Sequence, residues 1–147
     1  MPGAEESLQG AGRAAQERDE GSRPAARVLI VDDERAVGAV LGRMLNSMNV
    51  TFSQSAAGAL GRIAAGGDYS AIVCDLRMPG MDGLQFFGEV EKLNAGLARR
   101  IVFVTGAAAD SNFEAFLEKT GCAYLQKPVD AEALRSAVSA AASNVRP

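Results

Sequence analysis

Short apolar runs alternate along the chain with longer segments whose apolar residues have a helical spacing. Three runs are apolar without interruption and two more contain polar residues as well; they lie at residues 28–31, 71–74 and 101–104, and at 50–53 and 123–126. An uninterrupted apolar run is typical of a strand covered on both faces, as in a parallel sheet between two layers of helices. The pattern therefore predicts five strands in a covered sheet.

The segments between the strands carry the period of amphipathic helices. In the first segment the apolar spacing predicts a helix over residues 34–48 with one buried face, formed by Val37, Val40, Leu41, Met44, Leu45 and Met48. Further along, Ser55 and Asp130 are expected helix N-caps, and Gly121 is an expected helix end. A helix is therefore expected after each strand.

This order of elements predicts an α/β fold. A strand and a helix alternate five times, and parallel strands joined in this way have right-handed crossovers. Five strands are too few for a closed eight-stranded barrel. The expected architecture is a (βα)5 doubly wound parallel five-stranded sheet with helices on both faces.

Composition narrows the class of protein. The 147 residues are 48% hydrophobic and 22% charged, as in a soluble globular domain, and the net charge of −3 favours neither nucleic acid nor an anionic membrane as a direct partner. No apolar run approaches the roughly 18 residues of a membrane-spanning helix. Two cysteines, Cys74 and Cys122, are too few for a disulfide framework. We therefore expect a cytoplasmic protein that binds neither nucleic acid nor a membrane directly.

The apolar content also predicts the domain boundaries. Residues 1–26 contain only Leu8 as a large aliphatic residue besides Met1, so they are expected to form a disordered N-terminal arm or linker. Residues 27–142 contain all the predicted elements and form the expected domain. Residues 143–147 are then a short C-terminal tail.

Polar side chains follow four of the five predicted strands at their C-terminal ends: Asp32 and Asp33, Asp75, Thr105, and Lys127. In an open parallel sheet these ends share one edge, where ligands bind. Taken singly, each has a simpler interpretation as a helix cap, a turn residue, a strand end or a solvated charge. Together they would crowd three carboxylates, which repel one another. A divalent cation and a lysine would relieve that repulsion.

The same residues resemble the receiver domain of bacterial two-component response regulators, over about residues 27–142. The resemblance depends on four stretches: Leu29–Asp33, the D-x-x-M-P-x-M-x-G pattern of Asp75–Gly83, Val104–Gly106, and Tyr124–Pro128. It implies a flavodoxin-like fold with strand order 2-1-3-4-5. It also implies a Mg²⁺-dependent phosphoacceptor site and a cis peptide bond before Pro128.

The resemblance assigns roles at this site residue by residue. Asp75 corresponds to the phosphoacceptor. Asp33 corresponds to a direct Mg²⁺ ligand, Asp32 to a ligand through water, and Asp75 with the backbone carbonyl of Arg77 to the remaining protein ligands. Carboxylate and carbonyl oxygens suit Mg²⁺, which keeps several waters.

Three further positions complete the implied site and switch. Lys127 corresponds to a fixed positive charge for a phosphoryl oxygen, and Thr105 to a hydroxyl donor. Thr105 and Tyr124 correspond to the pair of residues that couples phosphorylation to a change of conformation.

The function implied is that of a signalling switch rather than an enzyme in the ordinary sense. The chain has no histidine, so a histidine kinase or a histidine phosphotransfer protein would supply the phosphoryl group in trans. The phosphorylated protein would then control an unknown downstream partner or relay the phosphate. Because few residues follow the last predicted helix, we expect a single-domain regulator.

Three alternatives remain open from the sequence. The chain could be the receiver portion of a hybrid histidine kinase. An aspartyl-phosphate hydrolase would need an acid two residues after the nucleophile, where Arg77 stands. A flavodoxin-like cofactor binder would need a phosphate loop after the first strand, where Asp32, Asp33 and Glu34 would repel phosphate.

Overall fold

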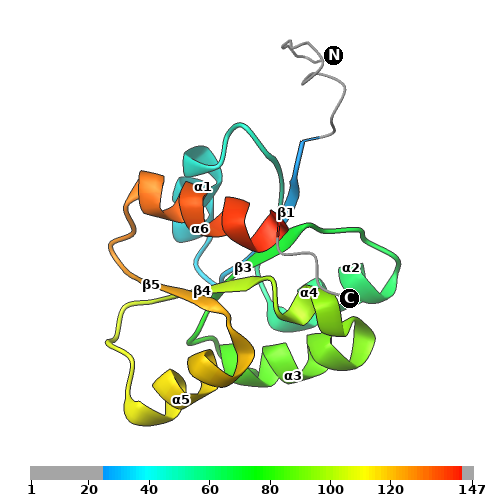
Figure 1. Ribbon diagram of the computed structural model, residues 1–147. Helices are drawn as coiled ribbons and strands as arrows, with labels where there is room; N and C mark the ends of the chain where they lie inside the picture. The colour runs from blue at the N-terminus through cyan, green and yellow to red at the C-terminus, as the bar shows by residue number, and fades with distance from the viewer. Residues whose placement is uncertain (1–24, 144–147) are drawn as a thin grey trace, which may run out of the picture.

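A five-stranded parallel sheet lies at the centre of the computed structural model, which describes residues 25–143 (Figure 1). Its strand order is β2-β1-β3-β4-β5, and every neighbouring pair is parallel. The strands are β1 (Arg27–Val31), β2 (Asn49–Ser53), β3 (Ala71–Asp75), β4 (Ile101–Thr105) and β5 (Ala123–Gln126). The predicted fold class, strand positions and order are confirmed.

Helices cover both faces of the sheet (Figure 1). On one face lie α1 (Arg35–Met44) and α6 (Ala131–Ser143). The other face carries α2 (Ala56–Ala64), α3 (Gly83–Leu93), the short α4 (Ala95–Ala98) and α5 (Ser111–Thr120). The apolar pattern did not predict α4, because a single turn is too short to show a period; its N-cap is Asn94, whose side chain accepts a bond from Leu97 N at 3.0 Å.

The two faces of the sheet bury two separate cores, and β1 shows why its sequence is apolar throughout. Leu29 and Val31 pack in the core under α2, α3 and α5, whereas Val28 and Ile30 pack in the core under α1 and α6. All four side chains have no exposed surface. Because successive strand residues point to opposite faces, both sets must be apolar, and each fully buried aliphatic side chain stabilises the fold by about 1.5–3 kcal/mol.

Helix α1 is shorter than the sequence predicts. It ends at Met44, because Leu45 adopts φ −107° and ψ 32° and its N–H bonds back to the carbonyls of Leu41 and Gly42. Leu41 and Leu45 are buried, but Val40 is 41% exposed. The expectation that Val40 faces the core is therefore wrong: the apolar stripe of this helix is wider than the arc that the sheet covers.

A glycine inside α1 allows this helix to approach the sheet closely. A Cβ atom on Gly38 would overlap the ring of Phe52 on β2. Glycine in a helix costs about 1 kcal/mol relative to alanine. Here that cost is offset because the aromatic ring occupies the space a side chain would need.

The predicted ends of the domain lie near the limits of the described residues. Most of the predicted arm, residues 1–26, and of the predicted tail, residues 143–147, lies outside them. Strand β1 begins at Arg27 and α6 ends at Ser143. Among the described helices, none has the length and apolar character needed to cross a membrane.

Candidate functional site

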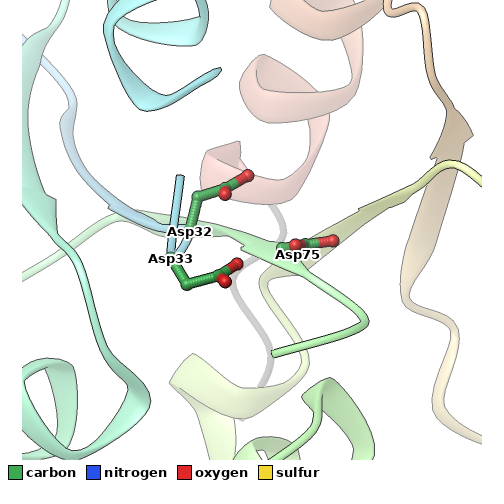
Figure 2. A group of neighbouring side chains, drawn as sticks. All are labelled: Asp32, Asp33 and Asp75. Atoms are coloured by element: carbon green, nitrogen blue, oxygen red, sulfur yellow. The ribbon is translucent and has the colours of Figure 1, made fainter. Parts of the chain in front are cut away.

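Three carboxylates meet at the C-terminal edge of the sheet, beside the ends of β1 and β3. Asp32 and Asp33 follow β1, and Asp75 ends β3 (Figure 2). One oxygen from each lies within 4.8 Å of the others. In the sheet, β2 lies on one side of β1, and β3, β4 and β5 lie on the other. The strand order therefore reverses direction between β1 and β3, and open α/β sheets bind ligands at such a point.

Asp32 is the most deeply buried of the three. Its side chain has no exposed surface, Oδ1 accepts a hydrogen bond from Glu34 N at 2.8 Å, and Oδ2 accepts one from Lys127 Nζ at 3.4 Å. Asp33 is half-buried, and its main-chain carbonyl accepts a long bond from Gln54 Nε2 at 3.4 Å. The two neighbouring aspartates therefore differ: Asp32 is held by the protein, and the Asp33 carboxylate borders the open site.

Asp75 is 7% exposed and lies between charges of both signs. Its Oδ1 accepts a hydrogen bond from Arg77 N at 3.4 Å and lies 3.6 Å from Lys127 Nζ. Burial raises the pKa of the Asp75 carboxyl, the nearby Asp32 and Asp33 raise it further, and Lys127 and the Arg77 N–H oppose the rise. The site thus stores electrostatic repulsion that a bound cation would relieve.

The ends of β4 and β5 complete the site. Lys127 N donates to the carbonyl of Thr105 at 2.8 Å, which places the Lys127 side chain against Asp32 and Asp75. Thr105 is buried, and its Oγ1 accepts a hydrogen bond from Ala107 N at 3.3 Å. The peptide bond between Lys127 and Pro128 is cis, as the resemblance implies.

These residues surround an open cleft of about 370 Å³. Its walls come from the loops after β1, β3 and β4 and from the end of β5; they are formed by Asp33, Glu34, Asp75, Arg77, Thr105, Gly106, Ala107 and Lys127. Asp32 lies buried behind this cleft, bonded to Lys127. The structure therefore brings together Asp32, Asp33, Asp75, Thr105 and Lys127, with Arg77 at the wall.

Tyr124 lies outside the cleft but contacts one of its walls. Its hydroxyl donates to the carbonyl of Ala107 at 3.2 Å, and its ring meets Phe113 of α5 edge-on at a centroid distance of 5.2 Å. Ala107 thus has Thr105 bonded to its N–H and Tyr124 bonded to its carbonyl. The two expected switch residues are joined through a single residue of the β4–α5 loop.

The donor set of the cleft fits a hard divalent cation. Asp32, Asp33 and Asp75 offer carboxylate oxygens, the ligands that Mg²⁺ prefers, and no nitrogen or sulfur ligand belongs to the cluster. Three negative charges also exceed the one positive charge of Lys127. The proposed contribution of the Arg77 carbonyl stays a prediction.

The sequence did not predict the roles of two supporting residues, Gln54 and Asp82. Gln54, after β2, accepts a hydrogen bond from Arg35 at 3.1 Å and donates to the Asp33 carbonyl, so it ties the β1–α1 loop to the β2–α2 loop. Asp82 caps α3 in a reciprocal capping box with Gln85. The Asp82–Gln85 spacing is a recognisable capping signal, whereas a glutamine after a strand carries no signal.

The glycine of the Asp75–Gly83 motif has a packing reason. Gly83 N donates to the carbonyl of Leu76 at 2.8 Å, and a Cβ atom on Gly83 would lie 3.0 Å from the Leu76 Cα. A side chain there would push the start of α3 away from the loop. The short loop from Asp75 to α3 therefore depends on this glycine.

Comparison with known proteins gives one family. The family model of the response regulator receiver domain matches residues 28–139. The transcriptional regulatory protein GlrR of Escherichia coli is 32% identical over 127 residues, which are 86% of this chain and 28% of that protein. The transcriptional regulatory protein TcrA of Mycobacterium tuberculosis is 31% identical over 109 residues, 74% of this chain and 42% of that protein. The matches thus span less than half the length of these two relatives.

Solved structures show the same fold. FixJ-N is 27% identical with a TM-score of 0.72, covering 85% of this chain and 99% of that one. A CheY-like response regulator receiver domain protein from Methanospirillum hungatei is 25% identical with a TM-score of 0.71, covering 80% of this chain and 94% of that one. The likeness extends over nearly the whole of both neighbours.

Proposed function

The chain belongs to the response regulator receiver family, and from that premise we propose that Asp75 accepts a phosphoryl group from a phosphohistidine carried by another protein. Receiver domains are signalling switches that act with histidine kinases or phosphotransfer proteins. The observation that carries the proposal for this chain is the cleft in which Asp75 lies with two further carboxylates and within 3.6 Å of Lys127. The hydrolase alternative lacks its second acid, because Arg77 occupies that position.

The surroundings of Asp75 suit a nucleophilic carboxylate. Oδ1 faces Lys127 and the Arg77 N–H, whereas Oδ2 has no hydrogen-bond partner within residues 25–143. Burial keeps the site partly dry, which strengthens each electrostatic interaction in it. Asp75 is thereby held in place by one oxygen while the other is free to attack phosphorus.

Asp32, Asp33 and Asp75 would hold Mg²⁺, with the Arg77 carbonyl as the further protein ligand. When bound, the ion neutralises the carboxylates and stabilises charge on the transferring phosphoryl group. Lys127 adds a fixed positive charge that a phosphoryl oxygen can meet. Thr105 supplies a hydroxyl from the C-terminal end of the neighbouring strand β4.

Ala107 would couple phosphorylation of Asp75 to the change of conformation, because it is hydrogen-bonded to both Thr105 and Tyr124. We propose that the Thr105 hydroxyl, which accepts a hydrogen bond from the Ala107 N–H, turns toward a phosphoryl oxygen and draws the β4–α5 loop with it. Tyr124 holds the Ala107 carbonyl, so movement of the loop changes the position of this ring against Phe113 on α5. The output would be a changed surface around α5 that controls a partner, or onward transfer of the phosphate.

Labelling with a small phosphodonor tests the proposal. With Mg²⁺ and acetyl phosphate, the wild-type protein should gain one phosphoryl group that hydroxylamine removes, and Asp75→Asn should gain none. Asp82→Asn is the matched control: it makes the same change in the same loop and keeps a good N-cap, so it should label like wild type. Undiminished labelling of Asp75→Asn would contradict the proposal.

A further inference from the structure

Asp33 is the carboxylate of the cluster that the described part of the protein holds least. Within residues 25–143 its side chain has no hydrogen bond or ion pair, whereas Asp32 accepts two hydrogen bonds and Asp75 accepts one from a main-chain N–H. One of its oxygens nevertheless lies within 4.8 Å of an oxygen of each of the other two (Figure 2). The position of the Asp33 carboxylate therefore depends on how the main chain of the β1–α1 loop is held.

The β1–α1 loop also lacks a tie that other loops at this edge of the sheet have. The N-cap residues of α2, α3 and α5 are Ser55, Asp82 and Asp110, and each of these side chains accepts a hydrogen bond from an N–H of the first turn. The N-cap residue of α1 is Glu34, and its side chain makes no such bond. The start of α1 and the loop before it must therefore be held from elsewhere.

The β2–α2 loop holds the β1–α1 loop from the side. The Ser53 carbonyl accepts a hydrogen bond from Asp32 N at 3.2 Å, and Gln54 Nε2 donates to the Asp33 carbonyl at 3.4 Å. Among residues 25–143, Gln54 is the one side chain that is hydrogen-bonded to Asp33. The main chain that carries the Asp33 carboxylate is thus tied through a side chain of a neighbouring loop.

Arg35 fixes the direction in which the Gln54 amide faces. An amide has one end that accepts hydrogen bonds and one end that donates them, whereas a guanidinium only donates. Arg35 Nη2 donates to Gln54 Oε1 at 3.1 Å, so the other end of the amide, Nε2, faces the Asp33 carbonyl. Because Arg35 is the first residue of α1, these two bonds join the two loops to the start of the helix. Gln54 and Arg35 are exposed and do not line the cleft.

Resting on the proposed function, in which Asp33 binds Mg²⁺ directly, we propose that Gln54 is a positioning residue for this metal ligand. Its bond to the Asp33 carbonyl holds the loop so that the carboxylate already lies in the acidic cluster before Mg²⁺ binds. A ligand held in place in advance costs less to order on binding, and hydrogen-bonded partners of metal ligands raise metal affinity in this way. Gln54 contacts neither metal nor phosphodonor and acts through Asp33.

Titration calorimetry of the full chain with Mg²⁺, without a phosphodonor, compares wild type, Gln54→Met and Gln126→Met. Methionine has an unbranched side chain of similar length but no N–H donor, so Gln54→Met removes the bond to Asp33. Mg²⁺ should bind this variant about three- to tenfold more weakly, a modest loss for a partner of a metal ligand, because the bond is long and exposed. Gln126, exposed at the end of β5 and outside the cleft, is the matched control and should leave Mg²⁺ affinity unchanged.

A double-mutant cycle shows whether Gln54 acts through Asp33. In Asp33→Ala no carboxylate is left to position, so adding Gln54→Met should lower Mg²⁺ affinity no further. A further loss as large as that in the wild-type background would overturn the proposal. In the metal-free protein, the NMR order parameters of the Asp33 and Glu34 amides should fall in Gln54→Met and stay unchanged in Gln126→Met.

Phosphorylation separates positioning of the metal ligand from a direct part in the transfer. With acetyl phosphate and increasing Mg²⁺, Gln54→Met should need about three- to tenfold more Mg²⁺ for its half-maximal rate, yet come within about twofold of the wild-type rate at saturation. Unchanged Mg²⁺ affinity in Gln54→Met would overturn the proposal and leave the proposed function standing. If wild type binds Mg²⁺ but is not labelled, the proposed function fails, and the calorimetry still decides the role of Gln54.

Discussion

Each charged residue of the cleft is stabilised by some neighbours and destabilised by others. Asp32 has two hydrogen bonds, to Glu34 N and Lys127, whereas Asp75 has one bond to a main-chain N–H and shares the same lysine. Three carboxylates around one ammonium group leave a surplus of negative charge in a largely buried place. The apo protein therefore retains the site at a cost in stability.

Neutralising Asp75 should stabilise the protein when no Mg²⁺ is present. The pKa of Asp75 is raised in the folded protein, so folding favours the protonated form. Its contribution to stability is full below the pKa of the unfolded chain and is lost as the pH rises through the folded pKa. At neutral pH, Asp75→Asn should raise the free energy of unfolding by about 1 kcal/mol, a typical size for one substitution.

Urea unfolding measures this effect. The gain should shrink toward acidic pH, where Asp75 is protonated as well. Asp82→Asn, which changes an exposed helix cap, should give almost no gain. If Asp75→Asn is less stable than wild type at neutral pH, repulsion from Asp32 and Asp33 does not destabilise the folded protein.

Asp33 and Asp32 should differ as metal ligands. Asp33→Ala removes a carboxylate that borders the open cleft, so Mg²⁺ affinity should fall about tenfold or more, as for loss of a direct charged ligand. Asp32→Ala should lower the affinity less but destabilise the fold more, because Glu34 N and Lys127 lose their acceptor. Titration calorimetry and urea unfolding measure both; equal Mg²⁺ affinity in wild type and Asp33→Ala would contradict the assignment.

At the scale of the elements, helices are fixed by what they pack against as well as by their own sequence. Gly38→Ala should destabilise the protein by about 1–3 kcal/mol, because the new methyl group would overlap Phe52 and overpacking outweighs the better helix propensity. Gly61→Ala, within α2, is the control: apart from its chain neighbours and the backbone of its own helix, no described atom lies within 4 Å of its added Cβ, so it should stabilise by about 0.5–1 kcal/mol. Thermal unfolding of the two variants measures the contrast, and equal gains would contradict the close packing of α1 on β2.

The β4–α5 loop should couple the site to α5. Thr105→Ala should still be phosphorylated on Asp75, since it keeps the nucleophile and the carboxylates. It lacks the hydroxyl that would link Ala107 to the phosphoryl group, so α5 and Tyr124 should not respond. NMR shifts of Ala107, Phe113 and Tyr124 follow the response; normal shifts in phosphorylated Thr105→Ala would rule out this coupling.

The strands could be predicted to within one residue at each end, but several helix features could not. Buried strands between two helix layers must be apolar at every position, and this pattern is hard to mistake in β1, β3 and β4. The end of α1, the exposure of Val40 and the existence of α4 depend on distances between elements, which one sequence does not contain. Gly38 shows the same limit, because its partner Phe52 is on another strand.

For the whole molecule, topology gathers the site from distant parts of the chain. Residues from the ends of four strands reach one cleft because all strands are parallel and their C-terminal ends share an edge. That argument could be made from sequence, and it placed Asp32, Asp33, Asp75, Thr105 and Lys127 together correctly. The supporting contacts of Gln54 could not be predicted, because they depend on loop geometry.

The curated relatives of this chain are longer than the part of them that it matches. The curated relatives are named as transcriptional regulatory proteins, and the matches span 28% and 42% of their lengths. A stand-alone role, the absence of direct nucleic-acid binding, and the kinase and downstream partner stay predictions for this chain.

The most direct test of the central claim is to trap the phosphorylated residue chemically. After reaction with acetyl phosphate and Mg²⁺, borohydride reduces an aspartyl phosphate to homoserine, which can be located by peptide mapping. The account predicts homoserine at position 75, only when both Mg²⁺ and the phosphodonor are present. Homoserine at another aspartate, or the same yield without Mg²⁺, would contradict it.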